Sequence, residues 1–124
     1  MKEVMAIVRM DMMTKTKKAL SEIDIPSLHA HACLGRGKGL VDMMVLKGAE
    51  KGYEEAVEQL GSGGRLIPKR VLSIILPDKK VDQVVKTIID INKTGKSGDG
   101  KVFVMPIDEA HRVRTGESGE EILD

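Results

Sequence analysis

The stretch Thr94-Gly-Lys-Ser-Gly-Asp-Gly-Lys101 decides the fold, because it joins two elements of different type. A helical pattern of apolar residues precedes it, and the strand-like run Val102-Phe-Val-Met105 follows it. A P-loop has the opposite order, since it follows a strand, opens a helix and ends in Ser or Thr for magnesium. Here Gly95-x4-Gly100-Lys101 is followed by Val102. The stretch therefore predicts a helix, a glycine loop of another lineage, and a strand.

The same stretch is a candidate phosphate-binding loop. Its three glycines within six residues let backbone N–H groups approach a ligand without interference from a Cβ. Positive charge comes from Lys101, and from Arg112 and Arg114 in the later run Arg112-Val-Arg-Thr-Gly-Glu117. A plain glycine-rich turn is the alternative for the loop by itself, and the two arginines favour the anion site.

Hydrophobic periodicity predicts the remaining elements. Apolar residues spaced as i, i+3, i+4 and i+7 indicate one helix from Thr14 to before Pro26, and a stronger one from Asp78 that Gly95 is placed to end. Apolar runs and alternating patterns predict four strands, over residues 2–10, 28–34, 67–76 and 102–107.

The order of these elements predicts an α+β fold. Two βαβ halves of similar length indicate a ferredoxin-like βαββαβ sandwich, in which both helices cover one face of a four-stranded antiparallel sheet. The other face is too apolar to be left in water, so we expect oligomerisation to cover it. Its predicted residues are Met5, Ile7, Leu72, Ile74, Phe103 and Met105.

Residues 40–66 form an excursion too long for an ordinary hairpin connection, since structureless loops beyond about 12–15 residues are uncommon in compact domains. Apolar residues from Ala49 to Leu60 recur at helical spacing, and Tyr53 is interpreted as packing this helical piece. We expect a single domain over residues 1–124, with a mobile excursion at 40–66 and a flexible tail at 118–124.

Composition excludes several classes of function. Twenty basic and nineteen acidic residues leave a net charge of +1, which provides no bulk field for nucleic acid or anionic lipid. The aromatic residues are only Tyr53 and Phe103, so stacking platforms for RNA are missing. One cysteine and the absence of a long apolar N-terminal run lead us to expect a cytoplasmic protein. The three histidines lack partners at ligand spacing, so no metal ligands are predicted.

The residues resemble a known family, the PII nitrogen-regulatory signal-transduction proteins. The runs Thr94–Val104 and Arg112–Glu117 are similar to its C-terminal signature nearly letter for letter, and residues 1–39 and 67–76 follow its pattern. Within the family, Gly35-Arg-Gly-Lys38, the glycine-rich excursion and Ile67-Pro-Lys-Arg70 most resemble the second PII paralogue of nitrogenase operons in methanogenic archaea.

The resemblance implies a homotrimeric sensor that binds ATP or ADP in clefts between subunits and reports 2-oxoglutarate through residues 40–66, the T-loop. Mg²⁺ would accompany ATP and 2-oxoglutarate, and the implied partners are a homologous PII chain and nitrogenase. Lys69 would pair with the distal carboxylate of 2-oxoglutarate, and Arg112 and Arg114 would reach in from a neighbouring subunit. The other implied nucleotide-binding residues are Gly35, Arg36, Gly37, Gly98, Asp99, Gly100 and Lys101 around the phosphates, and Ile7, His29, Ser73 and Thr94 around the adenine.

One departure from the family matters for 2-oxoglutarate. The glutamine that the family carries just after the Gly-x-Gly-basic segment, which helps hold magnesium and 2-oxoglutarate, is missing, and the only glutamines are Gln59 and Gln83. We therefore expect weak or no 2-oxoglutarate binding by this chain alone.

The competing hypothesis is a small phosphate-handling enzyme on the same fold, such as a nucleotide or acyl-phosphate hydrolase. An enzyme needs a base or nucleophile aimed at the transferred group. Asp99 is the sole acid inside the glycine loop, and no Ser/His/Asp or Cys/His arrangement is legible. The regulator is therefore favoured.

Overall fold

The computed structural model describes residues 1–38 and 66–123, so the predictions for the excursion, including Tyr53, lie outside the described residues. The elements are β1 (Lys2–Arg9), the 3-10 turn η1 (Met10–Met12), α1 (Met13–Glu22), β2 (His29–Gly35), β3 (Ile67–Leu76), α4 (Asp78–Asn92), β4 (Lys101–Pro106) and the 3-10 turn η2 (Glu120–Ile122). This order confirms the predicted α+β, ferredoxin-like fold class.

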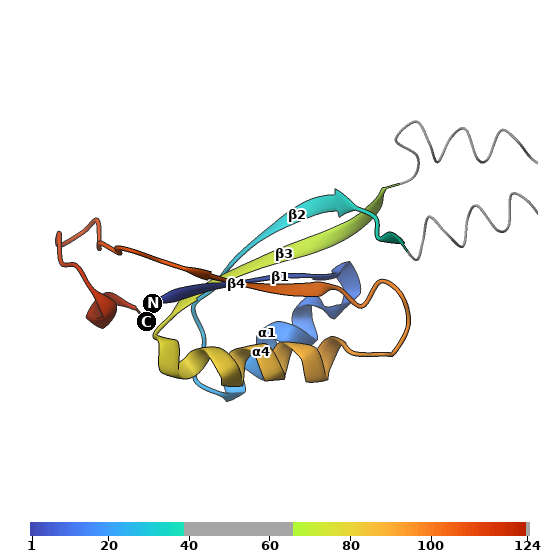
Figure 1. The fold of residues 1–124 in the computed structure, drawn as a ribbon, viewed down its shortest axis with the longest axis horizontal. Coiled ribbons are helices and arrows are strands. Elements are labelled where there is room, and N and C mark those ends of the chain that lie inside the picture. The colour runs from blue at the N-terminus through green and yellow to red at the C-terminus, as the bar shows by residue number, and fades with distance from the viewer. Residues whose placement is uncertain (39–65, 124) are drawn as a thin grey trace, which may run out of the picture.

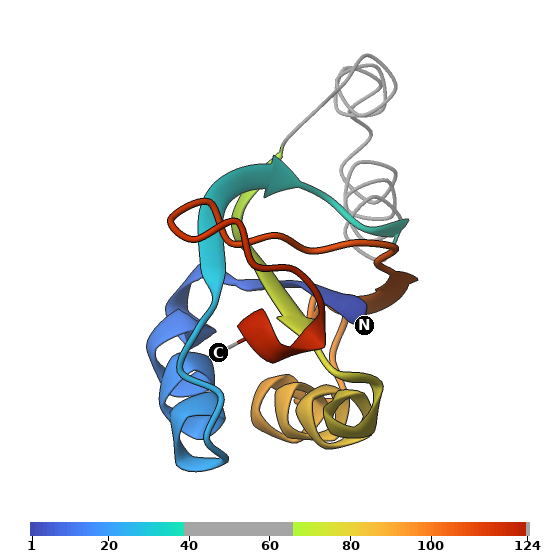
Figure 2. The ribbon, with the colours of Figure 1, turned by 90° about the vertical axis from the view of Figure 1, so that its left-hand side faces the viewer.

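The sheet has the strand order β2-β3-β1-β4, and every neighbouring pair is antiparallel. Both helices lie on the same face of the sheet, side by side, and the opposite face carries neither (Figures 1 and 2). The central strands β1 and β3 come from different halves of the chain, so the two halves share one core.

The core lies between this sheet and the two helices. Val4, Ala6 and Val8 alternate along β1 and are buried, and α4 contributes Val84 and Ile88 from the same side of the helix. Removing these aliphatic groups from water is the main driving force for docking the helices, at about 25 cal/mol for each Å² of apolar surface buried.

The open face is the face that carries no helix, and its predicted composition is partly wrong. Val4 pairs with Ile74, and Ala6 pairs with Leu72, so both β3 residues point into the core. They are 1% and 0% exposed, respectively. The open face instead carries apolar side chains interspersed with polar ones such as Glu3 and Ser73. Its half-buried or exposed apolar residues include Met5, Ile7, Ile75, Phe103 and Met105.

Helix α4 ends at Asn92, three residues before the glycine that was predicted to end it. The Nδ2 of Asn92 donates hydrogen bonds to Thr16 Oγ1 at 3.1 Å and to the Ile88 carbonyl at 2.9 Å. Lys93 then takes an extended conformation. The helix stops where a buried amide ties it to α1, and Gly95 serves the loop that follows.

The glycine loop and η1 lie at one end of the sheet, and the C-terminal segment after β4 extends from the other end (Figure 1). No helix in the described ranges is both long and apolar enough to span a membrane.

Candidate ligand-binding site at the glycine loop

The carboxylate of Asp99 holds the loop in its shape from inside. It accepts hydrogen bonds from the backbone N–H of Thr94 at 2.8 Å and of Gly95 at 2.9 Å, and from the Thr94 hydroxyl. Gly95 has φ +84°, a conformation that suits glycine. The start of the loop is thereby folded around the one acidic side chain within it.

Arg9, the last residue of β1, fastens this loop to the sheet. Its Nη1 donates to Asp99 Oδ1 at 2.7 Å, and its Nη2 donates to the carbonyl of Ser97 at 3.0 Å. The Thr94 hydroxyl, the Thr94 N–H and Arg9 together hold the pKa of Asp99 well below its usual range. Asp99 is therefore ionised and hydrogen-bonded at neutral pH, which makes it a poor general base.

Two loop glycines stand where a side chain would collide with a neighbour. A Cβ on Gly100 would lie 2.0 Å from the carbonyl oxygen of Ile7, and its φ is +117°. A Cβ on Gly98 would lie 3.3 Å from Arg9 Nη2, with φ +94°. The loop thus approaches β1 closely, and Gly98 leaves room for the arginine that holds it.

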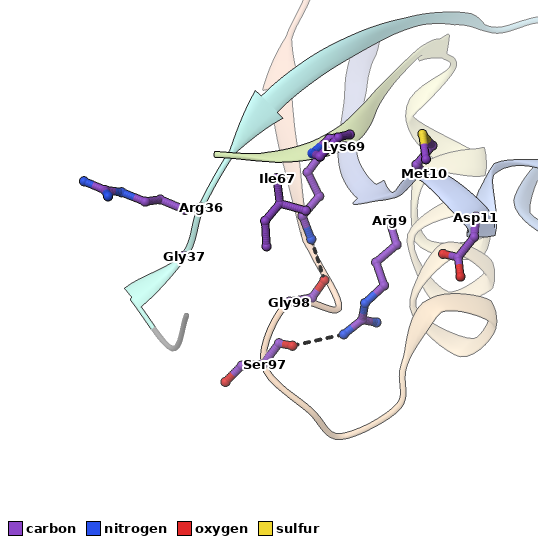
Figure 3. A pocket seen from close by; sticks show the side chains of 10 residues that line it. Arg9, Met10, Asp11, Arg36, Gly37, Ile67, Lys69, Ser97 and Gly98 are labelled. Atoms are coloured by element: carbon purple, nitrogen blue, oxygen red, sulfur yellow. Dashed lines mark hydrogen bonds between the residues drawn. The ribbon is translucent and has the colours of Figure 1, made fainter. Parts of the chain in front are cut away.

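A cavity of about 610 Å³ opens between the loop, η1 and the ends of β2 and β3 (Figure 3). Lys69 enters it from β3, and its Nζ donates to the Gly98 carbonyl at 2.9 Å. Partial burial, followed by the neighbouring charge of Arg9, lowers the pKa of Lys69. Arg9 also lines the cavity, and Asp11 is the one acidic residue among the described residues that line it, so the cavity favours an anionic ligand.

The structure brings several predicted site residues together at this end. The cavity is lined by Arg36, Gly37, Lys69 and Gly98. Gly35 ends β2, directly before Arg36. Thr94 and Asp99 build the loop, and Gly100 and Lys101 leave it beside Ile7, which pairs with Lys101.

The predicted adenine residues His29 and Ser73 lie farther along the sheet. They pair with each other across β2 and β3, on the open face. Ser73 Oγ donates to Glu3 Oε2 at 2.6 Å, and His29 is exposed. Within one chain these two residues are therefore separated from the glycine loop.

The segment after β4, which carries Arg112 and Arg114, extends from the end of the sheet opposite the loop (Figure 1). Their segment is ordered locally, because Arg112 N–H donates to the Glu117 carbonyl and Gly116 N–H donates to the Arg112 carbonyl, both at 2.7 Å. The Arg112 guanidinium also contacts Glu117 Oε1 at 3.3 Å, and Arg114 is exposed. The chain by itself does not bring these arginines to the glycine loop.

Sequence reasoning missed Arg9. The available signal was a charged residue at the end of a strand that is apolar on both faces. The role of Arg9, however, depends on its contact with Asp99 in a loop 90 residues away. The other lining residues that the sequence did not indicate are Met10, Asp11, Ile67 and Pro68, whereas Ser97 belongs to the predicted loop.

The fold and this site define a small α+β domain with a preshaped glycine loop beside a cation-lined cavity. The loop offers shaped backbone and cations to an anion, and its only carboxylate is committed to holding the loop.

Comparison with known proteins identifies the family. Residues 1–117 match the model of "Nitrogen regulatory protein P-II". The chain is 45% identical over 123 residues to "Nitrogen fixation nifHD1 region GlnB-like protein 2" of Methanosarcina barkeri, covering 97% of each chain. It is 41% identical over 125 residues to "Nitrogen fixation nifHD region GlnB-like protein 2" of Methanobacterium ivanovii, covering 99% of each.

A solved structure has the same fold. The chain superposes on Arabidopsis thaliana PII bound to citrate with a TM-score of 0.71 and 29% identity, covering 97% of this chain and 86% of the other. The chain belongs to the PII family of nitrogen regulatory proteins. The predicted family is therefore confirmed. Because its members are signal-transduction proteins and not enzymes, the hypothesis of a phosphate-handling enzyme is set aside.

Proposed function

We propose that the chain is a PII-type nitrogen sensor that binds ATP or ADP at the clefts between the subunits of a homotrimer. The observation that carries this proposal is the distance between two halves of one anion site. A preshaped glycine loop lies at one end of the sheet, and the segment that carries Arg112 and Arg114 extends from the other (Figure 1). A neighbouring subunit that presents its arginines to this loop completes a phosphate site.

The open face supports assembly into a trimer. Ile75 is 39% exposed and Phe103 is 41% exposed on this face, and neither is covered by a helix. Large apolar side chains exposed on a sheet face are typical of an interface, and packing this face against copies of itself would bury them.

The residues of the cavity fit anionic effectors. Arg36 and Lys69 line it, and Lys69 bonds only to a neutral carbonyl within the described residues. A carboxylate such as that of 2-oxoglutarate would balance this ammonium charge. Magnesium bound with ATP would neutralise part of the phosphate charge there.

Binding of 2-oxoglutarate by this chain alone stays weak in our proposal. Of the two glutamines, Gln83 lies exposed on α4, away from the cavity, and Gln59 lies outside the described residues. A homologous PII partner chain would then carry the sensing. Calorimetry that finds tight, ATP- and magnesium-dependent binding of 2-oxoglutarate to the isolated protein would overturn this.

The target is proposed to be nitrogenase, because the relatives above are named for the nifHD region of nitrogen fixation. The contact would run through residues 40–66. Deleting residues 42–63 and closing the gap with a short Gly/Ser turn should leave assembly and nucleotide affinity intact while abolishing target capture from nitrogen-fixing cells. Capture that persists after the deletion would show that another surface makes the contact.

The decisive experiment mixes two defective subunits. Lys101→Ala removes a cation from the loop, and Arg114→Ala removes one from the opposite end. Each variant alone should lose about 1.5–3 kcal/mol of ATP binding free energy. In mixed trimers, a cleft between the loop of the Arg114→Ala subunit and the arginines of the Lys101→Ala subunit is intact.

Calorimetry on the mixture should therefore reveal a class of sites with wild-type affinity. Mixed trimers with no such class would contradict a site shared between subunits. Unchanged affinity in both single variants would remove these residues from the site.

A further inference from the structure

Two cations turn two successive carbonyls of the glycine loop toward the sheet. Arg9 Nη2 holds the carbonyl of Ser97 at 3.0 Å, and Lys69 Nζ holds that of Gly98 at 2.9 Å. Arg9 and Lys69 are themselves register partners on β1 and β3. The peptide bonds described are all trans, so the N–H groups of Gly98 and Asp99 point away from these cations.

Arg9 and Lys69 hold the loop by different numbers and kinds of hydrogen bonds. Lys69 makes one hydrogen bond to a neutral carbonyl. Arg9 uses its planar guanidinium to bind the Asp99 carboxylate at 2.7 Å and a backbone carbonyl at once, which links the loop's internal framework to its outer peptide bonds. Its charge is balanced by Asp99, so an incoming anion competes less for Arg9 than for Lys69.

We infer that Arg9 is a positioning residue of the phosphate site, which fixes the peptide planes from Ser97 to Asp99 by binding Asp99 and the Ser97 carbonyl. This inference rests on the proposed function, since it assumes that the loop donates backbone N–H groups to phosphate. Its physical basis is preorganisation. A loop that already holds its donors in place does not lose conformational freedom when the anion arrives.

The test uses Arg9→Met, which keeps most of the side chain's bulk and removes its charge and donors. Arg9→Lys is the conservative variant, because an ammonium can replace the ion pair with Asp99 but lacks the fork that also reaches Ser97. Lys15→Met, an exposed position on α1, is the matched control for loss of one positive charge. Each full-length variant is titrated with ATP and with adenosine, and its ligand-free amide spectrum is recorded.

Arg9→Met should weaken ATP binding on the order of tenfold, while adenosine binding changes less than about twofold. Arg9→Lys should fall between Arg9→Met and the wild type, and Lys15→Met should match the wild type. Adding Asp99→Asn to Arg9→Met should cost less than the sum of the two single losses, because both changes remove the shared Arg9–Asp99 contact. The ligand-free amide signals of Gly95 and Gly98 should shift in Arg9→Met.

Unchanged ATP affinity in Arg9→Met, or equal losses for ATP and adenosine, would overturn the inference. If the wild type binds neither ATP nor ADP, the proposed function fails by itself. The ligand-free spectra then decide the role of Arg9, and unchanged signals of Gly95 and Gly98 would refute it.

Discussion

The two faces of the sheet are built from the same strands and both carry apolar side chains, yet among the described residues helices cover only one of them. On the helix face, Val4, Leu72 and Ile74 are at most 1% exposed. On the open face, Ile75 and Phe103 are about 40% exposed. The comparison teaches that alternation alone tells which residues share a face and not which face the chain itself covers.

The helix face buries its apolar side chains within the subunit, whereas we propose that the open face packs against another copy of the chain. A substitution on the first should unfold the chain, and one on the second should separate copies of it. Three predictions test or refine this contrast.

The largest contrast is between two neighbours on β3. Ile74→Lys places a charge in the core, which should cost at least about 4 kcal/mol and unfold the subunit. Ile75→Lys places the same charge on the open face opposite Glu3, so the subunit should stay folded and the assembly should dissociate. Circular dichroism and sedimentation measure the two effects. An Ile75→Lys protein that still sediments as a trimer would remove this part of the open face from the interface.

The next contrast concerns two glycines with positive φ. Gly100→Ala should destabilise the fold by about 3 kcal/mol or more, since its Cβ would meet the backbone of Ile7 at 2.0 Å. Gly116→Ala, at φ +74° in the C-terminal segment with nothing within 4 Å, should cost only the left-handed conformation, about 1 kcal/mol. Urea unfolding compares them. Equal losses would mean that the close approach of the loop to β1 is not what requires glycine.

The smallest contrast is a pH effect at the loop, which belongs to neither face. The folded-state pKa of Asp99 lies below its unfolded value, so its stabilising contribution is present above the usual Asp pKa and is lost as pH falls toward the folded value. Asp99→Asn should lower stability at pH 7 and flatten the decline below about pH 4. Thermal melts between pH 2 and 7 measure this. Parallel curves for wild type and variant would exclude Asp99 as the source of the acid dependence.

The fold could be predicted because local patterns determine its elements. The predicted strand at residues 67–76 agrees with β3 at both ends, and the valines and isoleucines of α4 have helical spacing. The face of β3 could not be predicted, because Val71 and Leu72 are both buried in succession and the alternation is broken there. Only pairing with β1 fixes the direction of Leu72.

The candidate site, like the fold, could be predicted only in part from the sequence. Glycines and cations in a short run could be recognised, because their chemistry is local. The roles of Arg9 and Asp99 could not, because they depend on a contact between the first strand and a loop near the other end of the chain. The nucleotide and 2-oxoglutarate assignments rest on family resemblance and remain predictions.

The amide of Asn92 has a consequence for the order of folding. Thr16 Oγ1 in α1 donates to the Met12 carbonyl and accepts from the Asn92 amide. Because this amide also donates to the Ile88 carbonyl of its own helix, its two hydrogens are bound one to each helix. Aliphatic side chains alone would let two helices slide along each other, whereas this buried bond allows one axial setting. The glycine loop starts two residues later, at Thr94. The bonds that fasten the loop to the sheet, from Arg9 to Asp99 and to Ser97, also join the two halves of the chain. We therefore expect an incompletely folded chain to present no competent loop to a nucleotide.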